Sequence, residues 1–72
     1  MTAPRSMTPQ ADRLRTLRIE KAMSQRELAK VAGVRPGTLN RVEKGLPTRL
    51  STIAALAAAL GVAPLDIASV DA

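Results

Sequence analysis

The sequence predicts an all-α domain of four to five short helices and no β-strand. Apolar residues recur at the three- and four-residue spacing of a helix face, and Ser, Thr, Pro and Gly stand where helices would begin and end. The 72 residues include no aromatic side chain and no Cys, so aliphatic side chains must build the core without a disulfide. A chain of this length accommodates one small domain, which we expect at residues 8–70 after a disordered tail at residues 1–7.

The first helix is expected to begin with Thr8 as its cap and Pro9 at its first position, where a missing N–H loses no intrahelical hydrogen bond. It should continue to residue 21 or 22. Leu14 and Leu17 lie on one face of this helix and are expected to contribute to the core.

The second helix has a clear start signal. Ser24 followed by Glu27 forms a capping box, in which each side chain accepts a hydrogen bond from a backbone N–H of the first turn. Gly33 can adopt the left-handed conformation that ends a helix. The predicted apolar face of this helix consists of Leu28, Val31 and Ala32.

A third helix follows after a short turn. Pro36 suits its first position and Gly45 can close it, which predicts a helix over residues 36–44. The residues of this unit that should pack inward are Val34, Leu39 and Val42.

Two residues of opposite charge are predicted to point inward. Arg18 shares the apolar face of the first helix, and Glu43 lies beside Val42 on the apolar side of the third. Because charged side chains are rarely buried without a partner, we expect an Arg18–Glu43 ion pair. The alternative is that Arg18 is solvated or contacts a phosphate.

The last part of the chain is also predicted to be helical. Residues 46–48 should form a loop, a helix should run from about Arg49 to Leu60, and Gly61 should end it. A short final helix can form at residues 64–68. The apolar face of the longer helix consists of Ile53, Leu56, Ala57 and Leu60.

The charge balance favours a polyanionic partner. Eleven Lys and Arg oppose six Asp and Glu, which gives a net charge of +5, and nine of the basic residues lie between Arg13 and Lys44. The alternative is that these residues only keep a small domain soluble. The chain has no His and no Cys, so we expect no enzymatic activity, metal or cofactor. No segment resembles a signal peptide or a membrane span, so we expect a cytoplasmic protein.

The outward face of the third helix carries the candidate chemistry. It holds Gly37, Asn40, Arg41 and Lys44. Arg41 suits a bidentate contact with guanine and Asn40 a contact with adenine or a phosphate in the major groove of DNA. Arg35, just before the helix, is a second candidate for reading bases. The alternative is a helix face that is only solvated.

The spacing of the two central helices resembles the helix-turn-helix of the phage repressor and Cro family, the XRE type. Counted from Gln25, Ala29 is fifth, Gly33 ninth, Leu39 fifteenth and Val42 eighteenth. The similarity extends from Leu14 to Val62. It implies a sequence-specific DNA-binding transcriptional regulator, expected to be a repressor, with the helix at residues 36–44 in the major groove and a homodimer on double-stranded DNA.

The resemblance also implies roles for individual residues. In this family an Arg and a Glu at the positions of Arg18 and Glu43 form a partly buried salt bridge. The chain departs from the family at Arg35, Pro36 and Gly37, where the family often has a polar cap and polar base-contacting side chains. The expected base contacts are therefore Arg35, Thr38, Asn40 and Arg41. The expected phosphate contacts are Ser24, Gln25, Arg26, Lys44 and Arg49.

A second function fits the same scaffold. Helix-turn-helix domains also serve as protein-interaction modules, such as an antitoxin that holds a toxin or an adaptor that does not touch DNA. A protein partner therefore remains an alternative to DNA. As a DNA-binding protein, the chain would be nucleoid-associated in the cytoplasm.

Overall fold

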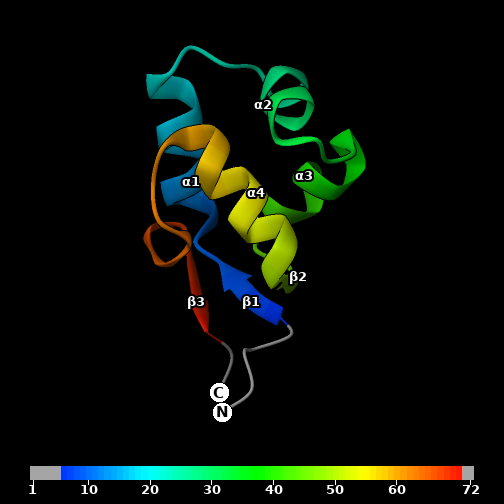
Figure 1. Cartoon of the computed structure of the whole chain (residues 1–72), viewed down its shortest axis with the longest axis vertical. Helices are drawn as coiled ribbons and strands as arrows, with labels where there is room; N and C mark the ends of the chain where they lie inside the picture. Colours follow the sequence, from blue (N-terminus) through cyan, green and yellow to red (C-terminus); the bar gives the residue numbers. More distant parts are fainter. Residues whose placement is uncertain (1–5, 71–72) are drawn as a thin grey trace.

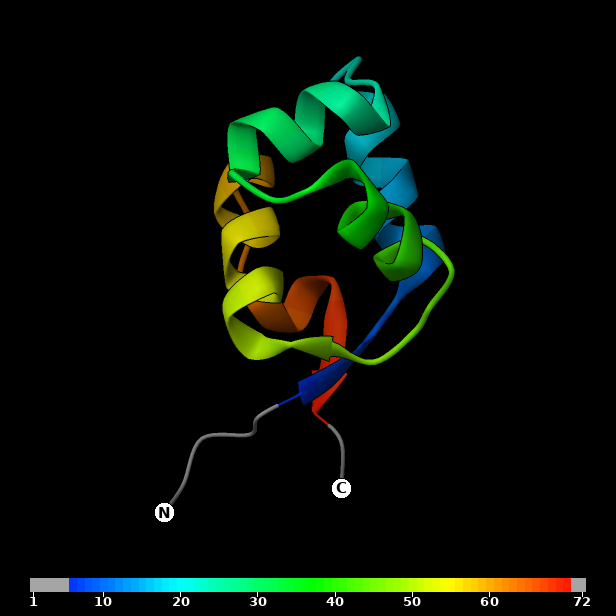
Figure 2. The ribbon, with the colours of Figure 1, turned by 90° about the vertical axis from the view of Figure 1, so that its right-hand side faces the viewer.

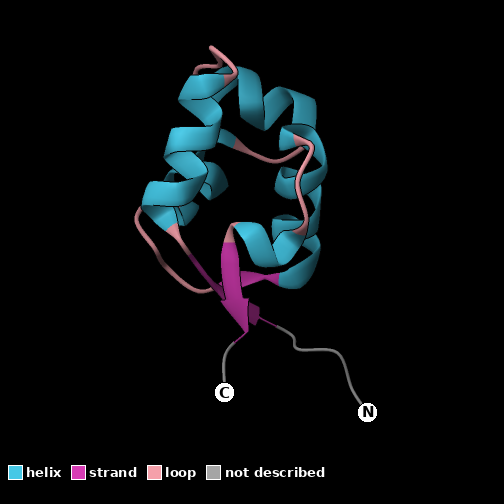
Figure 3. Cartoon of the chain, turned by 90° about the vertical axis from the view of Figure 1, so that its left-hand side faces the viewer, coloured by secondary structure: helices cyan, strands magenta, loops and turns pink. Residues whose placement is uncertain are grey.

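The computed structural model describes residues 6–70 and shows a cluster of helices with a small sheet at one end (Figure 1). The sheet lies at the end where the described chain begins and finishes (Figure 3). The α-helices are α1 (Ala11–Glu20), α2 (Gln25–Ala32), α3 (Pro36–Val42) and α4 (Leu50–Leu60), and a 3₁₀ turn, η1, covers Pro64–Asp66. The strands are β1 (Ser6–Pro9), β2 (Thr48–Arg49) and β3 (Ala68–Val70).

The sheet corrects the all-α prediction. Its strand order is β2-β1-β3, with both pairs antiparallel. Met7 lies opposite Thr48 on one side and opposite Val70 on the other. The central strand alternates between buried and exposed residues, and Met7 is buried in the core. A two-residue and a three-residue strand are too short to show this alternation in sequence.

The presence of the sheet also makes the predicted start of the first helix wrong. Thr8 and Pro9 belong to β1, and α1 begins at Ala11 after Gln10 as its N-terminal cap. Pro9 ends the strand beyond the part that pairs with β2, so one side of β1 is a sheet edge there, where a missing N–H is tolerated. Of the predicted disordered tail, residues 6 and 7 are instead part of β1, and residues 1–5 lie outside the described residues.

The end of the domain differs from the prediction as well. The expected final helix at residues 64–68 is only the short turn η1, after which Ile67 and Ala68 are buried. Ser69 and Val70 pair with β1 instead of trailing off. Thr48 and Arg49 form β2, so α4 begins at Leu50. The predicted apolar face of α4 is confirmed, because Ile53, Leu56, Ala57 and Leu60 are all buried.

The capping box of α2 is confirmed. The Glu27 N–H donates to Ser24 Oγ at 3.0 Å, and the Ser24 N–H donates to Glu27 Oε1 at 3.1 Å. The predicted apolar face is partly wrong, because Val31 is 63% exposed. Ala29 is buried in its place beside Leu28. A small residue at position 29 lets the neighbouring helices approach, which turns Val31 away from them.

Three helices end at a glycine with positive φ. At the end of α2, Gly33 has a φ of 72°, and the Val34 N–H reaches back to the Ala29 carbonyl. At the end of α3, Gly45 has a φ of 78°, and the Leu46 N–H reaches back to the Arg41 carbonyl. Both closures are Schellman motifs, which need a left-handed residue at this position. Regular helix α3 therefore stops at Val42, two residues before the predicted limit, and a closed turn follows it.

The core lies between the helices and the inner face of the sheet. It contains Leu14 of α1, Leu28 of α2 and the predicted inward pair of α3, Leu39 and Val42. Val34, Leu17 and Met23 are partly buried against it. The sheet and the segment before β3 add three residues that the helix pattern does not predict: Met7, Ile67 and Ala68.

Candidate nucleic-acid interface

Helix α3 has one buried and one exposed face. Leu39 and Val42 are completely buried, whereas Asn40, Arg41 and Lys44 are exposed. Figure 2 shows a short loop leading from α2 into α3, with α4 to the left of α3 and the sheet below the helices. The cationic side of this segment therefore points away from the interior of the domain.

An open groove lies beside α3 and has a volume of about 340 Å³. Thr38 and Arg41 line it from α3, and Arg49 lines it from β2. The remaining lining residues are Pro47, Thr48 and Thr52. Two guanidinium groups and the hydroxyls of Thr38 and Thr52 provide donors for an anionic ligand such as a phosphate. The Thr48 hydroxyl donates to the Leu46 carbonyl instead, at 2.9 Å. The groove thus brings together two predicted base contacts and one predicted phosphate contact.

The other predicted base contacts lie outside this groove. Arg35 is the N-terminal cap residue of α3, is exposed and makes no side-chain capping hydrogen bond. Asn40 is exposed on the helix. Pro36 and Gly37 offer no polar side chain at the start of α3. A Cβ atom at Gly37 would meet no other atom within 4 Å, so packing within the domain does not require glycine there.

The N-terminus of α2 forms a second polar surface. Ser24 and Arg26 are exposed, and Gln25 is partly buried. The capping box occupies the N–H groups of Ser24 and Glu27. Among the described residues, this leaves the N–H groups of Gln25 and Arg26 as the donors available to a ligand at this helix end. Helix N-termini favour anions because these donors and the helix dipole act together.

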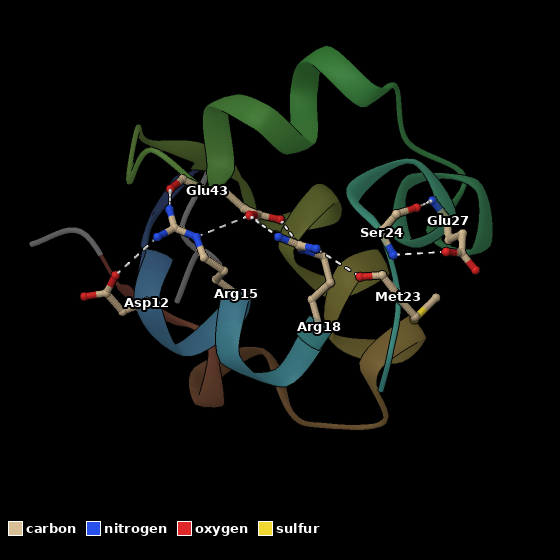
Figure 4. A network of polar contacts seen from close by, with 7 residues as sticks. All are labelled: Asp12, Arg15, Arg18, Met23, Ser24, Glu27 and Glu43. Atoms are coloured by element: carbon tan, nitrogen blue, oxygen red, sulfur yellow. Dashed lines mark hydrogen bonds and ion pairs between the residues drawn. The ribbon is translucent and has the colours of Figure 1, made fainter. Parts of the chain in front are cut away.

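A buried ion pair connects α1 to the end of α3 (Figure 4). Arg18 Nε and Nη2 donate to the two carboxylate oxygens of Glu43, at 2.8 and 3.1 Å. Arg18 Nη1 donates to the Met23 carbonyl at 2.9 Å, which ties the loop before α2 into the same contact. The Glu43 side chain is 3% exposed and that of Arg18 is 14% exposed. This is the pair expected from the inward placement of the two charges.

Arg15 joins this network, and the sequence interpretation gave it no role. Its Nη2 donates to the Glu43 backbone carbonyl at 3.1 Å, and its Nε lies 3.6 Å from Glu43 Oε1. Asp12 lies 3.9 Å from Arg15 on the other side (Figure 4). The sequence feature that could have predicted this role is the position of Arg15 three residues before Arg18, because this spacing puts both side chains on one side of α1.

The positive charge is confined to one part of the chain. All eleven Lys and Arg lie within residues 1–49, and residues 50–72 contain none. The helix-turn-helix and its flanks are therefore cationic, whereas α4, η1 and β3 are not. Within residues 6–70 no cluster of side chains suited to a metal ion is present. None of the described helices is long and apolar enough to cross a membrane.

The fold and this surface define a helix-turn-helix DNA-binding domain. The family model described as helix-turn-helix matches residues 14–67. The chain belongs to this XRE-type helix-turn-helix family and is a DNA-binding transcriptional regulator. A comparison with curated proteins gave no significant match.

Three solved structures show the similarity in detail. The restriction-modification controller protein C.AhdI from Aeromonas hydrophila is 37% identical, with a TM-score of 0.73 over 78% of this chain and 86% of that one. The hypothetical transcription factor NHTF from Neisseria is 38% identical, with a TM-score of 0.73 over 79% of this chain and 67% of that one. The clp gene regulator ClgR from Corynebacterium glutamicum is 33% identical, with a TM-score of 0.71 over 79% and 62%.

Proposed function

We propose that this protein is a sequence-specific, non-enzymatic repressor that inserts α3 into the major groove of double-stranded DNA. The observation that carries the proposal is the division of α3 into two faces. Leu39 and Val42 anchor the helix in the core, whereas Arg41 is exposed, as is Lys44 in the turn that follows the helix. The major groove admits a helix and displays acceptors that suit such side chains. Because its target is DNA, we place the protein in the cytoplasm, associated with the nucleoid.

Base reading in this proposal depends on few side chains. Arg41 would donate to the two acceptors of a guanine, and Asn40 would pair with an adenine or a phosphate. Arg35 and Thr38 would provide the remaining contacts. Since Pro36 and Gly37 carry no polar side chain, the start of α3 contributes little direct reading, and the shape of the DNA would supply additional specificity.

Two surfaces would hold the DNA backbone on either side of α3. At the first, the N–H groups of Gln25 and Arg26 meet a phosphate, with the Gln25 side chain and the Ser24 cap beside them. At the second, Arg49, which lines the groove formed by α3, β2 and α4, and the exposed Lys44 would each meet a phosphate. These contacts fix the position of α3 but carry no sequence information themselves.

We also propose that the protein binds as a homodimer. A two-fold dimer of helix-turn-helix domains meets half-sites about 34 Å apart. The segment from Leu60 to Val70 is the proposed contact, because it lacks cationic residues that would repel a second copy. Leu65 and Val70, which are both more than half exposed, supply apolar surface there.

Selection of bound sites from a random DNA pool, followed by titration at several salt concentrations, tests the proposal. We expect a recurrent palindromic site and an affinity whose logarithm falls with the logarithm of salt by about 0.9 per phosphate contacted. A protein-interaction module, such as an antitoxin or adaptor that does not touch DNA, would enrich no sequence. It would also fail to retain a random duplex at low salt, and that result would reject the proposal.

A further inference from the structure

The end of α3 is held by a side chain from a different helix. Arg15 of α1 donates from Nη2 to the Glu43 carbonyl at 3.1 Å, and Glu43 is the C-terminal cap residue of α3. Figure 4 shows the Arg15 guanidinium between Glu43 and Asp12. Arg18, by contrast, donates to the carboxylate of Glu43 and to the Met23 carbonyl, and not to the Glu43 backbone.

The Glu43 carbonyl is one of the carbonyls that the end of a helix leaves without an intrahelical donor. The turn after α3 satisfies two of its neighbours, because the Gly45 N–H donates to the Val42 carbonyl and the Leu46 N–H donates to the Arg41 carbonyl. The Glu43 carbonyl instead receives its hydrogen bond from Arg15. The direction in which the chain leaves α3, and with it the position of Lys44, therefore depends on a contact to α1.

We propose that Arg15 is a positioning residue for DNA recognition: it fixes the C-terminal end of α3 from behind and does not itself contact DNA. The inference rests on the proposed function, since it concerns the orientation of the helix that reads the bases. Arg15 is the only described side chain that bonds to the backbone of this helix end from another element. Its forked head binds the carbonyl and the Glu43 carboxylate at once, which a lysine ammonium cannot reproduce with the same geometry.

A direct phosphate contact by Arg15 is the competing role, because its side chain is 48% exposed. The geometry favours positioning. Nη2 is occupied by the Glu43 carbonyl, Nε faces the Glu43 carboxylate and Nη1 faces Asp12. A phosphate would have to compete with these two carboxylates for a guanidinium whose Nη2 already donates to the Glu43 carbonyl.

The test compares Arg15→Ala and Arg15→Lys with the matched control Arg13→Ala, which removes an exposed charge from the same helix. Each protein is titrated with two duplexes: one recovered from a random pool with the wild-type protein, and one of scrambled sequence. For both duplexes the salt slope is measured, which is the slope of the logarithm of affinity against the logarithm of salt concentration. Amide hydrogen exchange of the free proteins is followed by NMR at Gly45 and Leu46, with Val34, in the equivalent turn after α2, as the internal reference.

For Arg15→Ala we expect about a tenfold loss of affinity for the selected duplex, equivalent to one misaligned base contact. Affinity for the scrambled duplex should change by less than about twofold, with an unchanged salt slope. Exchange at Gly45 and Leu46 should accelerate while exchange at Val34 does not. Arg15→Lys should behave like Arg15→Ala, and Arg13→Ala like the wild type.

Two results would overturn the inference. A parallel loss on both duplexes, with a salt slope reduced by about 0.9 and rescue by Arg15→Lys, would identify Arg15 as a phosphate contact. Unchanged affinity and unchanged exchange would show that it has no role. If the wild-type protein bound neither duplex, the proposed function itself would fail. The exchange rates would then decide separately whether Arg15 orders the end of α3.

Discussion

Ala22 is the one described residue other than glycine with a positive φ, at 55°. It ends α1 in the way that glycines end the other helices. The Ala22 N–H donates to the Ile19 carbonyl, and the Met23 N–H donates to the Arg18 carbonyl, which is again a Schellman motif. The left-handed conformation costs an L-residue about 1 to 2 kcal/mol, a penalty that glycine avoids.

We therefore expect Ala22→Gly to stabilise the domain by about 0.5 to 1 kcal/mol, after allowance for the greater freedom of glycine in the unfolded chain. Urea denaturation followed by circular dichroism measures the difference. Ala63→Gly is the control, because Ala63 is exposed and has an ordinary φ of −80°. That substitution should destabilise. A loss of stability in both variants would contradict the proposed strain at Ala22.

Removing one partner of the Arg18–Glu43 ion pair is expected to destabilise the domain, because the other charge then stays buried without a partner. Arg18→Ala leaves the Glu43 carboxylate buried without its two guanidinium hydrogen bonds. We expect a loss of about 3 kcal/mol in the free energy of unfolding. The double variant Arg18→Ala with Glu43→Ala should lose less than the sum of the two single variants. Additive losses would mean that the two residues act independently.

At the scale of elements, local signals predicted the helices and not the strands. The capping box, the glycine after α2 and the spaced apolar residues of α4 each lie within one short segment, so the sequence reveals them. Strand β1 depends on partners at Thr48 and Val70, far along the chain. Pairing between such distant segments has no local signature, and Thr8-Pro9 imitates the start of a helix.

The contribution of the sheet can be tested at Met7, which fills the core from β1. Met7→Ala should lower the free energy of unfolding by about 2 to 4 kcal/mol, through lost burial and the cavity that remains. Val70→Ala, on the neighbouring strand but largely exposed, is the control and should change it by less than about 1 kcal/mol. Equal effects of the two substitutions would show that β1 does not carry part of the core.

The candidate interface was predictable only in part. Burial of Leu39 and Val42 requires Asn40 and Arg41 to face outward, so the face of α3 follows from its own sequence. The groove could not be predicted, because it depends on the path of the chain through β2 to α4. Arg15 was missed because its main partner is a backbone carbonyl, which no residue pattern marks.

Substitution of Gly37 should have opposite effects on the stability of α3 and on its affinity for DNA. Glycine within a helix costs about 0.5 to 1 kcal/mol relative to alanine, and no neighbouring atom requires its small size. We expect Gly37→Ala to raise the free energy of unfolding by about this amount while weakening binding to a selected duplex, since a methyl group would intrude between α3 and the DNA. Greater stability with unaltered DNA affinity would remove Gly37 from the proposed interface.

At the scale of the whole molecule, charge and architecture divide the domain into two parts. The cations lie on the helix-turn-helix and its flanks, and the segment after Arg49 carries none. Such an asymmetric charge distribution orients a protein toward a polyanion as it approaches. In the proposed complex the cationic part faces DNA, and the segment without Lys or Arg is free to meet a second copy.

The central claim is that the exposed side of α3 reads base sequence, and Arg41 tests it most directly. Sites are selected from one random DNA pool with the wild-type protein and with Arg41→Ala, and the two enriched sequences are compared. We predict that the variant loses its preference for at least one G·C pair in each half-site while keeping the half-site spacing, with a cost of about 1 to 3 kcal/mol on the wild-type site. Recovery of the same sequence with the same affinity would contradict the claim.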